Sequence, residues 1–480
     1  MNKPVTPVIQ PPTRRQLLQR TACGFGALAL AGLNADRATA GEADNQNLDP
    51  RPPMFPARAK RVIFIFMQGG PSHIDTFDYK PELVGADGKD IDFTGVRFGT
   101  FGKDSKRKLM KPLWDFRQYG QSGRHVSDLF PHMAQHVDKM CLIHSMHTEG
   151  VAHGPSTLFM HTGATNLVRP SIGSWITYGL GSENRNVPGF ITINPSASKG
   201  GPRNWSNAFL PAVFQGTAVG RAGLPSAQAA IRHITNPRLP AEVQQRQFDY
   251  MQSLNRIQAD RAGRPDRMEA SIEAAELAFR MQLNAPGLME LSGESAATMA
   301  LYGIDRAETE DFGRQCLLAR RLAEADVRYV QINYADESTN PRWDQHSDMP
   351  RHAEHALAVD KPVAGLLADL EQRGMLDDTL VWWGGEFGRT PFAQGSDGRD
   401  HNPRGFTVWL AGGGTRAGYS HGATDEIGHL AVTDKVHMHD LHATILHLLG
   451  LDHLQLTYEY AGRNFRLTDV AGRVVDELLA

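Results

Sequence analysis

WGGEFGRTPFAQGSDGRDHNPRGFTVWLAGGG, residues 383–414, combines two apolar, strand-like ends with a polar middle. The strand-like runs are TLVWW at 379–383 and FTVWLAG at 406–412, and ionisable side chains lie between them, among them Glu386, Arg389, Asp397, Arg399, Asp400 and His401. In an open α/β sheet, ligands bind where loops leave the carboxyl ends of strands. Neighbouring carboxylate and imidazole groups are typical of metal and acid–base sites. The pattern therefore predicts a functional loop in an α/β protein, and a solvated loop with an ion pair or two is the alternative.

The composition is that of an ordinary globular protein. The chain has 480 residues, of which 41% are hydrophobic and 21% charged, enough for one large α/β domain or two smaller ones. The 50 basic and 53 acidic residues leave a net charge of −3, so the basic excess of a nucleic-acid binder is missing. Histidine is abundant, with 20 residues, which directs attention to metal ligands.

The first 40 residues predict a twin-arginine signal peptide. TRRQLL at 13–18 is followed by an apolar run at 22–33 and by ATA at 38–40, an order typical of a cleavable signal. The apolar core would span roughly 18 Å as a helix, too short for a bilayer. We therefore expect the twin-arginine machinery as a partner, a periplasmic or extracellular location, and no stable membrane span after cleavage. An uncleaved anchor is the alternative.

Only Cys141 and Cys316 remain once such a signal is removed, because Cys23 lies within it. The two lie far apart in sequence, one in a strand-like run and one on a helical pattern. Two buried free thiols are expected, and a fold built on disulfides is excluded.

The other apolar runs extend the α/β pattern. Residues 41–60 predict an extended linker, and RVIFIFM at 61–67, ended by Gly-Gly-Pro, is typical of a central parallel strand. Further strands are expected at 140–145, 188–194 and 328–334, and helices at 128–139, 155–163, 171–181, 311–325, 350–373 and 439–449. One domain over 61–480 is predicted, with a loop-rich and helical insertion at about 195–310.

Polar residues that follow several of these strands predict a metal site. Asp344 and His346 come soon after strand 328–334, Glu386 directly follows strand 379–383, and the pair Asp400 and His401 precedes the next strand. Oxygen and nitrogen donors so spaced suit zinc or a similar cation, although Asp–His hydrogen bonds are also common without metal. Asp75, beyond the first strand, is either another ligand or the cap of a turn.

His153 opens a helix, where free N–H groups and the helix dipole favour an anion. It is a candidate nucleophile, general acid or metal ligand, and a local hydrogen bond is the alternative. Arg389 and Arg399 are candidates for a bidentate clamp on an anionic substrate. Ordinary surface ion pairs would explain the same two arginines.

Several motifs together resemble the exported bacterial proteins of the "domain of unknown function 1501" family. They are RVIFIFMQGGPSHIDTFD, WDQH, GEFGRTP, GRDH and the closing DLHATILHLLGLD, and they span nearly the whole chain after the signal. The resemblance implies a branch of the alkaline phosphatase and sulfatase superfamily. It further implies a three-layer α/β/α sandwich with a central, mostly parallel sheet and an ester-hydrolase site with one or two metals.

The chain departs from the superfamily pattern at three points. HGPST at 153–157 has the spacing of the sulfatase nucleophile motif, but His153 replaces the cysteine or serine, so formylglycine cannot form there. Residues 386–388 read EFG where Asp-His-Gly is expected, and Gln68 replaces a metal-binding aspartate. Asp344, His346 and His401 remain as ligands of one metal.

The sequence therefore predicts an exported, metal-dependent hydrolase of sulfate or phosphate esters, such as those of polysaccharides. Zinc, calcium and manganese are all candidate cations, and the cation would activate a water molecule unless His153 attacks covalently. The first alternative is a non-catalytic envelope protein that binds anionic glycans. The second is a structural envelope protein that needs neither metal nor ligand.

Overall fold

The computed structural model describes residues 47–92, 106–231, 239–261 and 266–480. The predicted signal peptide at 1–40 and part of the predicted linker lie outside the described residues. Asn47–Ala480 forms one compact unit. None of the helices within the described ranges combines the length and the apolar character that a membrane span needs.

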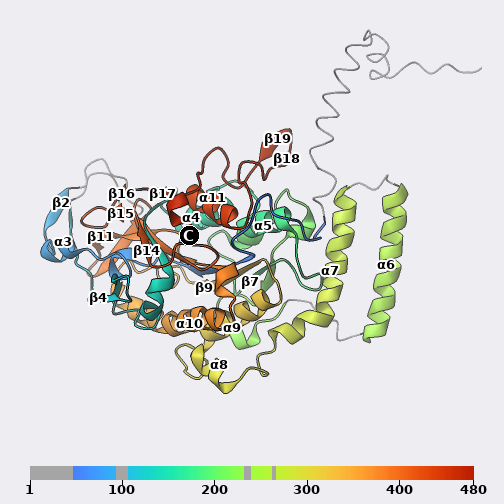
Figure 1. The fold of residues 1–480 in the computed structure, drawn as a ribbon, viewed down its shortest axis with the longest axis horizontal. Helices are drawn as coiled ribbons and strands as arrows, with labels where there is room; N and C mark the ends of the chain where they lie inside the picture. The colour runs from blue at the N-terminus through green and yellow to red at the C-terminus, as the bar shows by residue number, and fades with distance from the viewer. Residues whose placement is uncertain (1–46, 93–105, 232–238, 262–265) are drawn as a thin grey trace, which may run out of the picture. The chain divides into compact units, whose positions relative to one another are not determined.

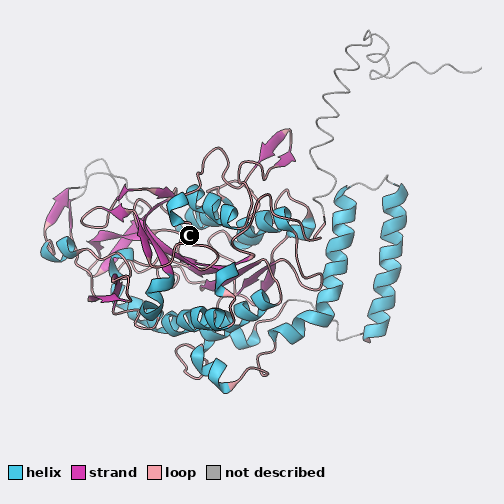
Figure 2. Cartoon of the chain, viewed as in Figure 1, coloured by secondary structure: helices cyan, strands magenta, loops and turns pink. Residues whose placement is uncertain are grey.

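A nine-stranded sheet runs through the centre of this unit, in the order β14-β6-β13-β10-β1-β9-β7-β8, with β17 paired to β6 (Figure 2). β1 (Arg61–Met67) lies between β10 (Thr379–Gly384) and β9 (Tyr329–Tyr334) and is parallel to both. Its residues from Val62 onward are buried, as continuous apolar runs predict for central parallel strands. The antiparallel exception beside them is β13 (Phe406–Ala411), which pairs with β10 and with β6 (Met140–His147). The sheet is completed by β7 (Phe190–Ile193), β8 (Thr217–Val219), β14 (Tyr419–His421) and β17 (Val436–His437).

Helices cover both faces of the sheet (Figure 1). On one face, Ile63, Ile65 and Met67 of β1 share a core with α9 (Glu310–Glu324) and α10 (His352–Gln372). On the other face, Val62, Phe64 and Phe66 share a second core with α4 (His153–Thr162), α5 (Ile172–Leu180) and α11 (Met438–Leu448). The alternation along β1 thus separates two cores, and the predicted three-layer α/β/α arrangement with a mostly parallel sheet is confirmed.

Two sequence predictions were wrong in their local structure. Instead of a helix at 128–139, a short 3-10 helix covers Met133–Lys139. The polar segment at 384–405 is no plain loop, because it contains a hairpin of β11 (Gly388–Gln394) and β12 (Gly398–Asn402). Every residue of β12 is buried, so Arg399, Asp400 and His401 lie in the interior.

The predicted insertion contains the helices α6 (Ala241–Arg261), α7 (Asp266–Met289) and α8 (Ala296–Leu301). The remaining short elements are α3 (Pro81–Gly85), β2 (Asp90–Asp92), β3 (Lys106–Lys108), β4 (Phe116–Tyr119), β5 (Arg124–Ser127), β15 (Ala423–Thr424), β16 (Ala431–Thr433), β18 (Tyr458–Tyr460) and β19 (Arg463–Phe465). Cys141 and Cys316 are free and buried, as predicted.

Candidate metal centre

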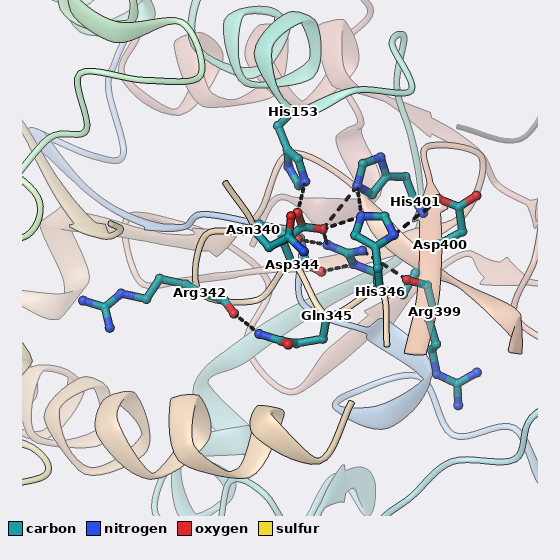
Figure 3. A network of polar contacts seen from close by, with 12 residues as sticks. His153, Asn340, Arg342, Asp344, Gln345, His346, Arg399, Asp400 and His401 are labelled. Atoms are coloured by element: carbon teal, nitrogen blue, oxygen red, sulfur yellow. Dashed lines mark hydrogen bonds and ion pairs between the residues drawn. The ribbon is translucent and has the colours of Figure 1, made fainter. Parts of the chain in front are cut away.

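Four side chains from three separate parts of the chain converge at one edge of the sheet (Figure 3). They are His153 at the start of α4, Asp344 and His346 in the loop after β9, and His401 in β12. Among the described residues, they form a group that could hold a metal ion, with one ligand atom from each within 4.8 Å of the others. We call these four residues the His₃Asp cluster.

The sheet topology explains this convergence. β1, β9 and β10 are parallel, so the loops that follow them open at the same edge. β13 is antiparallel to β10 and begins at the edge where β10 ends, so the segment that connects them stays at this edge and brings His401 into the cluster. Gly69, after β1, has a φ of +105°, and a Cβ there would lie 2.2 Å from the carbonyl oxygen of Pro341. Glycine therefore lets this loop approach the loop that carries Asp344.

Asp344 lies at the centre of the cluster. Its Oδ1 is 2.8 Å from Nε2 of His346 and 3.3 Å from Nε2 of His401, and its Oδ2 is 3.0 Å from Nε2 of His153. The Nε2 atoms of His346 and His401 are themselves 3.1 Å apart. Three imidazole nitrogens and a carboxylate thus share one small space.

The opposite ring nitrogen of each histidine faces an oxygen atom of the protein. Nδ1 of His153 lies 2.5 Å from Oε1 of Glu386, and Nδ1 of His346 lies 2.5 Å from Oε1 of Gln394. Nδ1 of His401 lies 2.7 Å from the carbonyl oxygen of Val151. Because these oxygens accept hydrogen bonds, each Nδ1 carries the proton in the neutral ring, and each Nε2 lone pair points into the cluster. Metal-binding histidines are normally held in this way.

The electrostatics of the cluster favour a positive species between these atoms. Although burial raises the pKa of Asp344, the charge of Arg389 and the contacts with the three histidines hold that pKa far below its ordinary value. Burial lowers the pKa of His401 to about 4, although the contact with the Asp344 carboxylate acts to raise it, so this ring is neutral at pH 7. Burial also acts to lower the pKa of His153, but hydrogen bonds to Asp344 and Glu386 outweigh it and raise that pKa. A cation can replace the proton that His153 would otherwise hold.

Arg389 is buried completely and orients Asp344. Its Nη2 lies 2.7 Å from Oδ1 of Asp344, and its other N–H groups donate to the carbonyl oxygens of Gly69, Gly70 and Arg399. Because its N–H groups already donate to these atoms, Arg389 is not available to bind an anionic substrate. The predicted anion clamp does not fit this position.

Arg399 and Asp75 form a separate, fully buried ion pair, with Nε of the arginine 2.8 Å from Oδ2 of the aspartate. Arg399 also donates to the carbonyl oxygens of Met110, Thr390 and Lys111, and Asp75 accepts from Ser72 and Leu113. In Figure 3 the guanidinium of Arg399 points away from the His₃Asp cluster. These contacts place Asp75 outside the metal ligands and Arg399 outside any substrate clamp.

Asp400 and Glu386 lie next to the cluster without belonging to it. Oδ1 of Asp400 accepts a hydrogen bond from the backbone of His401 and lies 3.9 Å from Nδ1 of His346. Glu386 accepts hydrogen bonds from the backbone N–H of Gly69 as well as from His153. Both carboxylates therefore contact histidines of the cluster and do not face the space between the four ligand atoms. No sequence pattern pointed to Gln394 and Val151 as supporting residues, because neither the buried hairpin nor the loop before α4 was predicted in detail.

Replacing Glu386 tests this supporting role. In Glu386→Gln an amide oxygen can still accept from Gly69, but the charge that holds the tautomer of His153 is lost. We expect metal affinity to fall about 10- to 100-fold while the protein stays folded, as is usual when a residue that orients a metal ligand is replaced. Competition with a chromogenic chelator measures this affinity, and the exposed Glu354→Gln is the matched control. Unchanged metal affinity in Glu386→Gln would show that Glu386 does not support His153 as a metal ligand.

Comparisons with solved structures show a distant similarity in fold. Lipoteichoic acid synthase LtaP from Listeria monocytogenes is 10% identical, with a TM-score of 0.36 over 88% of this chain and 79% of its own. PsFucS1 sulfatase from Pseudoalteromonas sp. is 12% identical, with a TM-score of 0.33 over 89% of this chain and 72% of its own. A TAB5 alkaline phosphatase variant with Mg bound is 11% identical, with a TM-score of 0.34 over 82% of this chain and 99% of its own. Likenesses at this level do not tell what this chain binds.

No functionally curated protein matches the sequence significantly. One family model, described as "Protein of unknown function (DUF1501)", matches residues 59–479. That range includes the whole central sheet and all four residues of the His₃Asp cluster. The chain therefore belongs to the DUF1501 family of proteins of unknown function, as its motifs predicted.

Proposed function

We propose that this protein is an exported, metal-dependent hydrolase of sulfate or phosphate esters, such as those of polysaccharides. The observation that carries the proposal is the His₃Asp cluster, in which three oriented Nε2 atoms and the carboxylate of Asp344 face one point. The ester class rests on the family resemblance of the motifs. Export rests on the twin-arginine pattern at 13–18.

The donor set points to zinc as the cation, with manganese as the second choice. Three imidazole nitrogens and one carboxylate oxygen suit these metals. Calcium, which the sequence left open, is coordinated by oxygen atoms and does not fit three nitrogens. A bound divalent cation supplies Lewis acidity and lowers the pKa of a nearby water molecule.

The chain around the cluster would bind and orient an anionic ester. α4 begins at His153, so the positive end of its dipole lies at the cluster and favours a sulfate or phosphate group. The side chain of His346 is 18% exposed, against 3% for Asp344 and 7% for His153. A substrate would therefore approach from the side of His346.

An assay with purified protein tests the proposal. The protein is prepared without chelators and offered a panel of aryl sulfates, aryl phosphates and sulfated polysaccharides, before and after chelator treatment. We expect hydrolysis that chelator removes and zinc restores, and that His401→Ala lacks. If the wild type hydrolyses nothing in the panel with its metal bound, or if chelator leaves hydrolysis unchanged, the proposal fails.

A non-catalytic protein that binds anionic glycans is the second candidate, and the coordination of the cluster favours it in one respect. Four protein ligands complete a tetrahedral shell, as in structural zinc sites, whereas catalytic zinc usually keeps one position open. This candidate predicts tight glycan binding that is unaffected by chelator and releases no product. A purely structural role would instead predict no glycan binding and no metal.

Export can be tested by itself. Replacing Arg14 and Arg15 together by lysine should leave most of the protein in the cytoplasm as an unprocessed precursor, because twin-arginine signals depend on this pair. Cell fractionation and immunoblotting measure the distribution, and Arg20→Lys is the control in the same segment. Normal export of the double variant would show that another route is used.

A further inference from the structure

A cavity of about 380 Å³ lies at the carboxyl ends of β7, β8 and β9. These three strands are parallel to one another, and β9 is also parallel to β1, so the cavity lies at the same sheet edge as the His₃Asp cluster. Its volume is within the range of small-molecule sites, roughly 300–1,000 Å³. Gly223, Pro225 and Asp311 of its lining are exposed, so the cavity is open to solvent.

The loop after β9 connects the cavity with the cluster. Ala335 and Arg342 of this loop line the cavity, and Asp344 and His346 of the same loop belong to the cluster. The Cα atoms of Arg342 and Asp344 are two residues apart in the chain, so they lie within about 7 Å of each other. In Figure 3 the side chain of Arg342 points away from the His₃Asp cluster. A molecule that extends from the cluster into the cavity would therefore have its far end beside Arg342.

Two buried amide oxygens of the lining lack a hydrogen-bond partner among the residues that the structure describes. They are Oε1 of Gln315 and Oδ1 of Asn194, and the two residues are 4% and 3% exposed. Nε2 of Gln315 donates to Oδ2 of Asp311 at 3.4 Å, and because a carboxylate only accepts, this contact fixes which end of the amide is the oxygen. Nδ2 of Asn194 donates to Oγ of Ser226 at 2.8 Å. Since buried polar atoms are nearly always paired, the two oxygens indicate a ligand that carries hydrogen-bond donors.

The charges and the aromatic ring of the lining argue against two other classes of ligand. Nε of Arg342 lies 3.5 Å from Oδ2 of Asp336, and Asp311 adds a negative charge, so no excess positive charge favours a second anionic group. Tyr334 is the one aromatic residue in the described lining, and its ring packs against the guanidinium of Arg342 at 4.8 Å and against Phe312 at 5.3 Å. It therefore offers no free surface for stacking a nucleobase. An uncharged, hydroxyl-rich group fits best.

We propose that this cavity binds the sugar residue of an ester whose sulfate or phosphate group lies at the His₃Asp cluster. Hydroxyl groups of the sugar donate to Oε1 of Gln315 and Oδ1 of Asn194, and Arg342 donates to the oxygen atoms of the sugar. The choice of an ester rests on the proposed function, and the cavity narrows the substrate class to glycans rather than nucleotides. A neutral sugar should also bind by itself, because none of these contacts needs the metal.

Isothermal titration calorimetry of the purified protein with neutral trisaccharides of glucose, galactose, mannose and N-acetylglucosamine tests this proposal. We expect at least one of them to bind the wild type, with a dissociation constant that rises about tenfold in Gln315→Met because one hydrogen bond is lost. Gln245→Met is the matched control, since Nε2 of the exposed Gln245 also donates to an aspartate, Asp249, at 2.8 Å. This control should bind the sugar like the wild type. Circular dichroism checks that each variant is folded.

Arg342→Met is a second variant and covers the case in which Gln315→Met does not fold. The side chain of Arg342 is 32% exposed, so its replacement should leave the protein folded and its metal content unchanged. We expect sugar affinity to fall at least about fivefold, because a charged donor is lost. The control is Arg351→Met, whose arginine forms a similar ion pair with Glu354, at 3.7 Å, and is 49% exposed.

The outcomes separate this proposal from the proposed hydrolase function. Sugar binding that survives chelator treatment in a protein without hydrolysis would contradict the hydrolase and support the cavity as a sugar site. Chelator-sensitive hydrolysis in a protein that binds none of the four trisaccharides would overturn the sugar site and leave the hydrolase. Binding that is unchanged in both Gln315→Met and Arg342→Met would also overturn the sugar site. Adenosine, titrated in parallel, would identify a nucleoside as the ligand if it alone bound and Gln315→Met weakened it.

Discussion

Asp344→Ala is expected to cause the largest loss of function of any single substitution in this chain. The oxygens of Asp344 contact the Nε2 atoms of all three histidines in the His₃Asp cluster. Residues that only orient a metal ligand already contribute 10- to 100-fold to metal affinity, so we expect losing this central ligand to lower affinity by more than about 100-fold. Chelator competition and the hydrolysis assay measure the two effects.

The control for this substitution is Asp397→Ala. Asp397 lies between the two strands of the β11–β12 hairpin, outside the His₃Asp cluster, and its side chain accepts a hydrogen bond from the neighbouring Ser396. We expect this variant to bind metal like the wild type. Retained metal affinity in a folded Asp344→Ala protein would contradict the assignment of Asp344 as a ligand.

The second large effect is expected on stability, from Arg399→Met. This change leaves Asp75 buried without its partner, and breaking a buried ion pair on one side typically costs about 3–5 kcal/mol. Urea unfolding measures the loss in free energy. Where the variant is too unstable to purify, its yield in the soluble fraction serves as the readout.

The surface pair of Arg117 and Asp128 provides the comparison. Its arginine side chain is 70% exposed, so Arg117→Met should cost less than about 1 kcal/mol. If Arg399→Met kept full stability and lost only affinity for an anionic substrate, the original prediction of a substrate clamp would be right and the structural role wrong.

The central sheet could be predicted from the sequence because buried parallel strands have a clear sequence pattern. β1, β9 and β10 are covered on both faces, so each reads as a continuous apolar run. The β11–β12 hairpin has no such pattern in its sequence. Its burial depends on contacts such as Arg399 with Asp75, 324 residues away in the chain, which no local pattern reveals.

The same reasoning explains which site residues were found. Asp344, His346 and His401 were predicted from their positions near strand ends. The fold brings those ends together whatever the detailed course of the loops. The separate roles of Glu386 and Asp400 depend on side-chain directions within the loops, which spacing does not determine. His153 was recognised as a functional candidate, and its proposed role as a ligand comes from the fixed Nδ1 contact with Glu386.

The central claim is that the His₃Asp cluster binds a divalent cation, and anomalous diffraction from crystals grown with zinc tests it most directly. The account predicts one strong peak at the zinc absorption edge, about 2.0–2.2 Å from Nε2 of His153, His346 and His401 and from an oxygen of Asp344. A map with no peak between these four side chains, in crystals that contain zinc, would contradict it.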